Sequence, residues 1–230
     1  MPTTKTIVVN CAGRGSRLGL NSNKSLIDID GKPLIIRQLE CLDDYDDIRI
    51  VVGFQAEKLI EVVCSYRKDI MFVFNHDYLN TKTAASLSLG KKYSRDTVIS
   101  LDGDILFFKE DFDNFVNTDG EIIGVCQPYT KDPVYVKTDF INDGEFATEF
   151  SRTNGDYEWT GLFKIYSKNL SSGTNHVYKM ISPNLPLKIA HVELREIDTP
   201  EEYNEALKWY RNKNKGDFIW VMQREFMKNM

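Results

Sequence analysis

The chain has few of the residues that mark redox, metal-thiolate or nucleophilic chemistry. Its 230 residues include four cysteines and three histidines, with no C-x-x-C pair and no cysteine–histidine ligand spacing. The histidines form no Ser/His/Asp or Cys/His arrangement, so we interpret His76, His176 and His191 as structural or surface residues. The cysteines lie in apolar contexts that favour reduced core residues. Thiolate-metal sites and serine- or cysteine-type nucleophilic catalysis are therefore not expected.

An excess of positive charge and long apolar runs are also missing. Lys and Arg number 29 against 34 Asp and Glu, giving a net charge of −5, which offers no attractive field for nucleic acid. No stretch reads as a secretory leader or is long enough to span a bilayer. We therefore expect a cytoplasmic protein without a nucleic-acid or membrane partner. With 42% hydrophobic residues, no repeat and no low-complexity linker, the chain fits a single domain.

The most informative segment that is present is residues 10–19, which read NCAGRGSRLG. It follows an apolar run at 6–9 that is typical of a buried strand. Two glycines allow the backbone to turn sharply, so that successive N–H groups can face an anion. Arg14, Arg17 and Lys24 add positive charge beside this turn. The segment therefore predicts a polyphosphate-binding loop.

The spacing within this loop excludes two common phosphate-binding motifs. No Gly-Lys-Ser/Thr ends it, so it is not a Walker A loop. A dinucleotide fingerprint needs a third glycine where Leu18 stands, and Gly19 comes one place late. Two arginines and a lysine suit a triphosphate, whose larger charge must be stabilised further when one phosphorus is attacked.

Strand-like and helix-like segments alternate along the first 120 residues, which predicts an α/β fold with helices on both faces of the sheet. The expected strands are 6–10, 48–53, 71–75 and 97–101, and the expected helices are 34–42, 56–66 and 83–93. After residue 120 the pattern is richer in strands, at 121–127, 134–139, 146–150, 160–166 and 191–197, with a helix at 167–181. A helix over 199–212, capped by Thr199, and a final amphipathic helix over 217–230 complete the prediction.

The loop and two later positions carry a resemblance to a known family. The motif Ala12-Gly13-x-Gly15-x-Arg17-Leu18, then Lys24, then residues 31–35 (GKPLI), resembles the signature of nucleotidyltransferases that activate sugar phosphates and phospho-alcohols. Among these, CTP:phosphocholine cytidylyltransferases are the most similar, and the resemblance covers roughly residues 6–210. The family usually has Pro-Lys where this chain has Asn23-Lys24.

The resemblance implies a Rossmann-like, three-layer α/β/α fold with a mostly parallel mixed sheet and a smaller β-rich acceptor subdomain. On this basis residues 1–230 form a single nucleotidyltransferase domain. Its nucleotide-binding half spans about 1–120, its acceptor-binding half about 121–198, and its C-terminal helices 199–230. We expect a monomer or a homodimer.

Two pairs of acidic residues follow predicted strands, at the edge of the sheet where open α/β folds bind ligands. Asp102 and Asp104 follow the strand 97–101, and alternation places Glu196 and Asp198 on one face of the strand 191–197. Few carboxylates together with substrate phosphates suit Mg²⁺. The resemblance assigns the metal to Asp104 and Asp198 with Glu196 beside them, and Asp102 to the nucleotide site. The alternatives are an ordinary Asp-Gly turn and, for the last aspartate, a helix cap.

The resemblance also assigns the remaining site residues. Lys24 would contact the α-phosphate of a nucleoside triphosphate and Arg17 the β- and γ-phosphates. The other nucleotide-binding candidates are Ala12, Gly13, Arg14, Gly15, Ser16, Thr83 and Ser86. The acceptor candidates are Glu158 and Trp159, with Tyr135 nearby. Aromatic residues there suit a quaternary ammonium and equally suit an apolar core.

These assignments predict a Mg²⁺-dependent cytidylyltransferase that joins CTP to a small phosphorylated acceptor and releases pyrophosphate, for decoration of a surface polysaccharide or lipid. The acceptor stays open among phospho-alcohols, phosphonates, phosphoramidates and sugar 1-phosphates, the last with another nucleotide. A GT-A glycosyltransferase is an alternative, because Asp102-Gly103-Asp104 fits its D-x-D motif. A non-catalytic nucleotide-binding regulator is another. Glycosyltransferases consume nucleotide sugars, so the cationic triphosphate loop argues against them.

Overall fold

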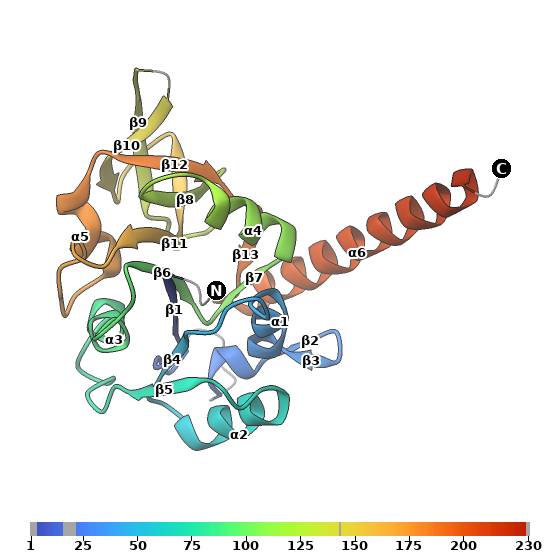
Figure 1. Cartoon of the computed structure of the whole chain (residues 1–230), viewed down its shortest axis with the longest axis horizontal. Coiled ribbons are helices and arrows are strands. Elements are labelled where there is room, and N and C mark those ends of the chain that lie inside the picture. Colours follow the sequence, from blue (N-terminus) through green and yellow to red (C-terminus); the bar gives the residue numbers. More distant parts are fainter. Residues whose placement is uncertain (1–3, 16–21, 143, 229–230) are drawn as a thin grey trace.

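A computed structural model describes residues 4–15, 22–142 and 144–228, with side chains as far as residue 214. The described chain is built around a nine-stranded mixed sheet with the order β5-β4-β1-β6-β11-β8-β12-β10-β9 (Figure 1). The expected α/β fold is thus confirmed.

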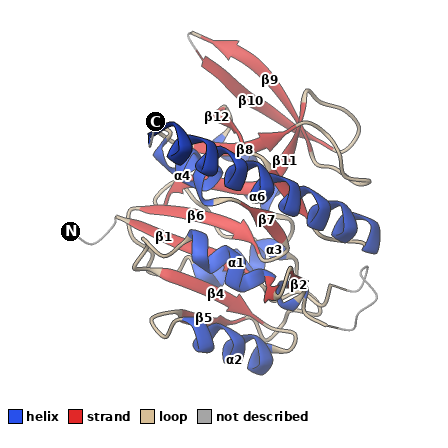
Figure 2. Ribbon diagram, turned by 90° about the vertical axis from the view of Figure 1, so that its right-hand side faces the viewer, coloured by secondary structure: helices blue, strands red, loops and turns tan. Residues whose placement is uncertain are grey.

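The first half of the sheet consists of four parallel strands, which lie side by side in Figure 2. They are β5 (Met71–Phe74), β4 (Ile48–Val52), β1 (Lys5–Asn10) and β6 (Thr97–Asp102). Asn10 lies beside Asp102 in the register of β1 and β6, so both strands end at the same edge. This pairing brings the glycine-rich turn and the Asp-Gly-Asp turn together.

Antiparallel pairing dominates the second half. Its strands are β8 (Ile122–Cys126), β9 (Tyr135–Ile141), β10 (Gly144–Ser151), β11 (Tyr157–Tyr166) and β12 (Leu187–His191). β11 joins the halves by pairing with β6 on one side and β8 on the other. Only the β12–β8 pair within this half is parallel among the described strands. Strands β9 and β10 form a hairpin that projects from the body (Figure 1).

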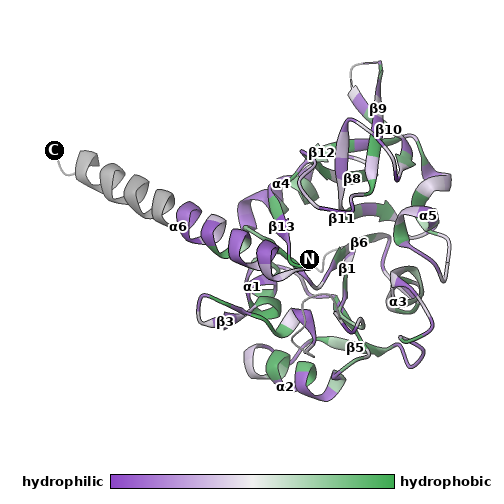
Figure 3. Cartoon of the chain, turned by 180° about the vertical axis from the view of Figure 1, so that it is seen from behind, coloured by the Kyte–Doolittle hydropathy of each residue, from purple (hydrophilic) through white to green (hydrophobic). Residues whose placement is uncertain are grey.

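Helices cover the sheet on both faces, because side chains of successive strand residues point to opposite sides. Ile7 and Val9 pack with α1 (Leu34–Cys41), α2 (Ala56–Tyr66) and α4 (Lys109–Asn117). Val8 packs on the other face with α3 (Thr83–Gly90) and α5 (Val177–Ile181). Figure 3 shows both green and purple residues on α2, as expected for a helix with one buried face.

Two short strands outside the main sheet matter for the site. β7 (Ile105–Phe107) and β13 (Leu194–Glu196) form a two-stranded antiparallel ribbon. A smaller ribbon of β2 (Asp28–Ile29) and β3 (Lys32–Pro33) precedes α1. The long helix α6 (Pro200–Lys228) packs its first turns against both ribbons, through a cluster that includes Ile29, Leu106, Ile197 and Ala206.

Several boundaries differ from the sequence prediction. The helix expected over 167–181 forms only at α5, because the preceding stretch runs as a loop against α3, where the Gly173 N–H donates to Ser88 Oγ. The strand expected over 191–197 is split, since β12 stays in the main sheet and β13 pairs with β7. The helices expected over 199–212 and 217–230 are one helix, α6, and α4 was not expected. The packing predicted for the apolar tail, residues 217–230, lies outside the described side chains, which end at residue 214.

Within the part of the chain that the structure describes, none of the helices combines the length and the apolar character needed to cross a bilayer.

Arg49 of β4 forms a largely buried ion pair with Asp47, the residue just before the strand. This pair leads to a prediction about stability. Arg49 is 5% exposed, and its Nε lies 2.9 Å from Asp47 Oδ1. Burial alone would raise the pKa of Asp47, but hydrogen bonds from Arg49 and Thr6 and the charges of Arg49 and Arg95 together lower it. The stabilisation is therefore present above about pH 4 and is lost as the pH falls through the lowered pKa.

We expect Asp47→Asn to lower the free energy of unfolding at pH 7 by about 3 kcal/mol, because it leaves a buried guanidinium without its carboxylate. Urea denaturation at pH 7 and pH 3 would measure this, and the difference between wild type and variant should shrink at the lower pH. Asp44→Asn is the control, because its ion pair with Lys109 is exposed and should contribute at most about 1 kcal/mol. Equal losses at both pH values would contradict the prediction.

Candidate active site

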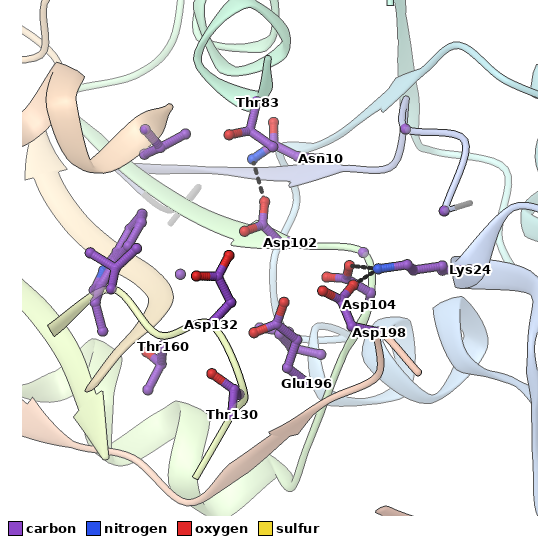
Figure 4. A pocket seen from close by; sticks show the side chains of 18 of the residues that line it. Asn10, Lys24, Thr83, Asp102, Asp104, Thr130, Asp132, Thr160, Glu196 and Asp198 are labelled. Atoms are coloured by element: carbon purple, nitrogen blue, oxygen red, sulfur yellow. Dashed lines mark hydrogen bonds and ion pairs between the residues drawn. The ribbon is translucent and has the colours of Figure 1, made fainter. Parts of the chain in front are cut away.

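A cavity of about 730 Å³ opens at the carboxyl ends of β1 and β6 and extends over β11 (Figure 4). Many residues that the sequence singled out line it: Gly13, Gly15, Lys24, Thr83, Asp102, Asp104, Glu158, Trp159, Glu196 and Asp198. Residues from both halves of the sheet thus meet in one cavity.

The glycine-rich turn reaches this cavity with Gly13 and Gly15. Gly15 has a φ of +59°, and a Cβ there would lie 2.5 Å from Lys24 Cγ, so glycine is needed both for conformation and for space. Arg14 does not line the cavity, because its guanidinium lies 5.7 Å from the centre of the Phe54 ring. Ala12 is buried. Ser16 and Arg17 lie outside the described residues.

Asn23 holds the turn that presents Lys24. Its Nδ2 donates to the carbonyls of Cys11 (2.8 Å) and Phe54 (3.1 Å), and its Oδ1 accepts from Ser25 N (3.0 Å). The side chain is buried, at 1% exposure. In the family's Pro-Lys pattern, proline restricts this turn by fixing its own φ. In this chain the three hydrogen bonds of the Asn23 side chain hold the turn, so Lys24 is still presented by an ordered backbone.

Lys24 lies among the acidic residues of the site (Figure 4). Its Nζ is 3.0 Å from Asp104 Oδ2, and it also forms an ion pair with Asp198 Oδ1. Oxygen atoms of Asp104, Glu196 and Asp198 lie within 4.8 Å of one another. Three converging carboxylates are a donor set that fits a hard divalent cation such as Mg²⁺.

The local fold explains how these carboxylates converge. Only glycine fits at position 103, because a Cβ there would lie 2.4 Å from both Cys11 Sγ and Ser25 Oγ. The turn before Asp104 can therefore pack closely against these two residues. Gln38 on α1 braces the same turn: its Nε2 donates to the carbonyls of Asp102 (2.9 Å) and Ile105 (2.8 Å). The ribbon of β7 and β13 then brings the second acidic pair alongside.

A capping box at the start of α6 fixes the end of the second acidic segment. The Glu202 carboxylate accepts from the N–H groups of Asp198 (3.0 Å) and Thr199 (2.9 Å), and Thr199 Oγ1 accepts from Glu202 N (3.2 Å). The predicted cap at Thr199 is confirmed. The N–H of Asp198 takes part in this cap while its carboxylate meets Lys24, so the structural and the ionic role coexist.

Crowding of carboxylates changes their proton affinity. Burial, together with the negative charge of Asp104, raises the pKa of Asp102 to about 7, against the hydrogen bond from Asn10. Burial and Asp104 likewise raise the pKa of Glu196 to about 8, and Lys24 opposes this shift. Such shifts are typical of functional sites.

The expected base-binding segment is arranged differently from the sequence interpretation. Thr83 lines the cavity, but Ser86 is buried and accepts a hydrogen bond from Asn75 Nδ2 (3.0 Å). The N–H groups of Lys82 and Ala84 donate to the carbonyls of Thr174 and Asn175. These N–H groups at the start of α3 therefore hold the 171–176 loop and are not free for a ligand.

The end of the cavity formed by the second half of the sheet contains residues that the sequence interpretation missed, namely Thr130, Lys131, Asp132, Arg152, His176 and Tyr178. Arg152 forms an ion pair with Asp132, and the His176 ring stacks on Tyr178 at 5.7 Å. All but Tyr178, which lies in α5, are in loops, where no periodicity marks them. Tyr135 does not line the cavity, and His176, interpreted as structural, does.

Comparisons with known proteins agree with this geometry. The family model described as "MobA-like NTP transferase domain" matches residues 7–121. The bifunctional protein GlmU of Aliarcobacter butzleri is 31% identical over 102 residues, which is 44% of this chain and 23% of that protein. A 2-C-methyl-D-erythritol 4-phosphate cytidylyltransferase of Clostridium tetani is 42% identical over 45 residues, 20% of this chain and 18% of that protein. The chain thus spans about a quarter or less of these curated relatives.

Solved structures with the same fold match over most of the chain. The CTP:phosphocholine cytidylyltransferase of Streptococcus pneumoniae superposes with a TM-score of 0.72 at 21% identity, covering 90% of this chain and 99% of that one. The inositol-1-phosphate CTP transferase of T. maritima gives 0.69 at 18% identity, covering 90% and 96%. At these identities the likeness concerns the fold.

Proposed function

The chain belongs to the family of MobA-like NTP transferase domains, and from this premise we propose that it is a Mg²⁺-dependent cytidylyltransferase. It would join CTP to a small phosphorylated acceptor to give a CDP-linked product and pyrophosphate. The observation that carries the proposal is the position of Lys24 between a glycine-rich turn and three converging carboxylates. This arrangement suits a triphosphate with its cation.

The proposed reaction needs no side-chain nucleophile. A phosphate oxygen of the acceptor attacks the α-phosphorus in line, a new P–O bond forms, and the bond to the β-phosphate oxygen breaks, releasing pyrophosphate. Lys24 would hold the α-phosphate, and Arg17 the β- and γ-phosphates. Asp104 and Asp198, with Glu196 beside them, would hold Mg²⁺, which neutralises charge on the phosphate oxygens. The protein's main task is to align two anions that repel each other.

The two halves of the domain would divide the substrates. We assign the nucleotide to residues of about 1–120 and the acceptor to about 121–198, where Arg152 and Lys131 offer charge for an acceptor phosphate. Trp159 packs edge-on against Phe150, so its ring also belongs to the apolar packing. We place the reaction in the cytoplasm, where nucleoside triphosphates are available, and its product in the decoration of a surface polysaccharide or lipid.

The choice of CTP is supported by the cytidylyltransferases among the similar proteins. A sugar-1-phosphate nucleotidyltransferase using another nucleotide is the second candidate, favoured by the GlmU matches. Pyrophosphate release with each of the four nucleoside triphosphates, against a panel of phospho-alcohols, phosphonates and sugar 1-phosphates, would test both. We expect CTP with a phospho-alcohol to give the highest rate. A preference for another nucleotide with a sugar 1-phosphate would replace the first candidate by the second.

The raised pKa values predict how the bound cation affects stability. A carboxyl group whose pKa is raised on folding favours the folded state while it is protonated, at low pH. This contribution is lost as the group ionises, which happens as the pH rises through about 7 for Asp102 and about 8 for Glu196. A cation relieves the repulsion mainly where the carboxylates are ionised. We therefore expect Mg²⁺ to raise the melting temperature more at pH 9 than at pH 6, by roughly 2–4 °C for each kcal/mol of repulsion relieved.

Thermal denaturation with EDTA or with Mg²⁺ at the two pH values measures this difference. Glu196→Gln serves as the matched variant, because the neutral amide should remove the part of the pH dependence that comes from Glu196 and leave the part that comes from Asp102. A Mg²⁺ effect of the same size at both pH values in the wild type would contradict the prediction.

A further inference from the structure

We propose that Glu158 and Tyr129 are positioning residues for the acidic cluster: Glu158 holds the 127–134 loop, and the hydroxyl of Tyr129 in that loop holds the backbone of Glu196. The sequence resemblance had placed Glu158 at the acceptor instead. The inference depends on the proposed function for the role of the cluster, and the contacts that carry it are independent of the reaction.

The carboxylate of Glu158 is already engaged by the loop. It is 3% exposed, and its Oε2 accepts from the N–H groups of Tyr129 (2.9 Å) and Thr130 (3.2 Å). Its Oε1 accepts from the Thr130 hydroxyl. A carboxylate offers about four acceptor positions, so three of them are taken. The loop is therefore the main partner of Glu158, and at most one acceptor position is left for a bound molecule.

The same loop contacts β13 through Tyr129. Glu196 N–H donates to Tyr129 Oη at 2.7 Å. The Arg195 guanidinium lies 5.6 Å from the centre of the Tyr129 ring, within the range of a cation–π interaction. Two neighbouring residues of β13 are therefore held by one side chain. Burial of the hydroxyl raises the pKa of Tyr129, so it stays protonated.

The geometry of β13 explains why this contact is needed. The strand is three residues long and pairs with β7 on one side. Ile197 N–H donates to Asp104 O (2.9 Å), so alternation turns the N–H of Glu196 towards the outer edge, where Tyr129 accepts it. The contact from Tyr129 therefore holds the outer edge of β13 and fixes the direction of the Glu196 side chain.

The test compares Tyr129→Phe, Glu158→Gln and Glu158→Ala by titrating Mn²⁺ into the protein without substrates, with free Mn²⁺ read by electron paramagnetic resonance. Residues next to metal ligands typically change metal affinity by 10–100-fold, and we expect about 10-fold weaker binding for Tyr129→Phe and Glu158→Ala. Glu158→Gln should lose less, because its amide oxygen still accepts from the loop. Tyr129→Phe keeps the bonds from Glu158 to the loop, so its acceptor KM should stay within about twofold while the Mg²⁺ concentration for half-maximal rate rises.

Matched controls come from the far side of the molecule. Tyr66 and Tyr129 are both 38% exposed, but the hydroxyl of Tyr66 donates to Asp43. Tyr66→Phe therefore removes a comparable hydroxyl that does not contact the acidic cluster. Glu121→Gln alters a glutamate that also accepts a backbone N–H, from Tyr166 at the opposite end of β11. Neither should change Mn²⁺ affinity. Asp198→Asn should abolish tight Mn²⁺ binding and so identify the cluster as the site.

Two results would overturn the inference. One is unchanged Mn²⁺ affinity in Tyr129→Phe and Glu158→Ala together with a raised acceptor KM, which would make Glu158 an acceptor ligand. The other is Mn²⁺ binding that survives Asp198→Asn, which would remove the cluster as the metal site. Failure of the proposed function looks different: wild-type protein would bind Mn²⁺ as expected yet release no pyrophosphate with any substrate pair, and the positioning effect would still be measurable.

Discussion

Lys24→Met should lower kcat by 10²–10³-fold, on the order of the loss when one preorganised charge stabiliser is removed from an active site. The expected cause is that the α-phosphate oxygens gain negative charge as the acceptor oxygen attacks the phosphorus. No other lysine among the described residues lies between Asp104 and Asp198. Methionine keeps the length and apolar character of the side chain, so the packing against Gly15 should survive.

Steady-state kinetics with saturating nucleotide and acceptor would measure the loss. Lys91→Met is the control, because Lys91 is a partly buried lysine that donates to the carbonyl of Leu170, away from the acidic cluster. It should leave kcat within about twofold. A Lys24→Met protein that folds normally, as judged by its melting temperature, and retains near-normal turnover would contradict the assigned role.

The second large effect is expected for the aspartate at the start of α6. Asp198→Asn should lower kcat by roughly 10³-fold, since a bound metal ion provides several kcal/mol of charge stabilisation in the transition state. Asparagine retains the backbone N–H that Glu202 accepts, so the cap of α6 stays intact. The loss should be partly reversed by raising the Mg²⁺ concentration, because the affinity for the cation falls as well.

Asp111→Asn is a matched control for this variant. Asp111 forms an ion pair with Lys213 of α6 at 2.8 Å, which stabilises the same helix away from the cavity. We expect a small effect on stability and none on the Mg²⁺ dependence. A Mg²⁺ dependence that is unchanged in Asp198→Asn would assign the cation to other ligands.

The first half of the fold was predictable because its signals are local. Apolar runs such as β4, buried along its whole length, and the glycine-rich turn after β1 are encoded within about ten residues each. Asp104 was expected at the ligand-binding edge from the general rule that parallel strands end there, whereas its pairing with Asp198 came from the family resemblance. The structure brings these two residues together around Lys24.

The end of the cavity formed by the second half of the sheet was less predictable because tertiary pairing determines it. Asp132 and Arg152 lie twenty residues apart in separate loops and meet only because β9 and β10 fold back as a hairpin. His176 reaches the cavity because the loop before α5 hydrogen-bonds to the start of α3. The contact between Tyr129 and Glu196 spans 67 residues. No periodicity in the sequence can indicate such pairs.

The most direct test of nucleotidyl transfer is ³¹P NMR of the wild-type protein with Mg²⁺, CTP and the best phosphorylated acceptor. The proposed function predicts that the CTP resonances disappear while pyrophosphate and a new diphosphate-linked product appear in equal amounts, with the acceptor phosphorus in the product. Turnover should be slower by about 10²–10³-fold in Lys24→Met and by roughly 10³-fold in Asp198→Asn. The contradictory result is CTP that stays intact, while a nucleotide sugar supplied in a parallel sample is consumed without pyrophosphate, as a glycosyltransferase would do.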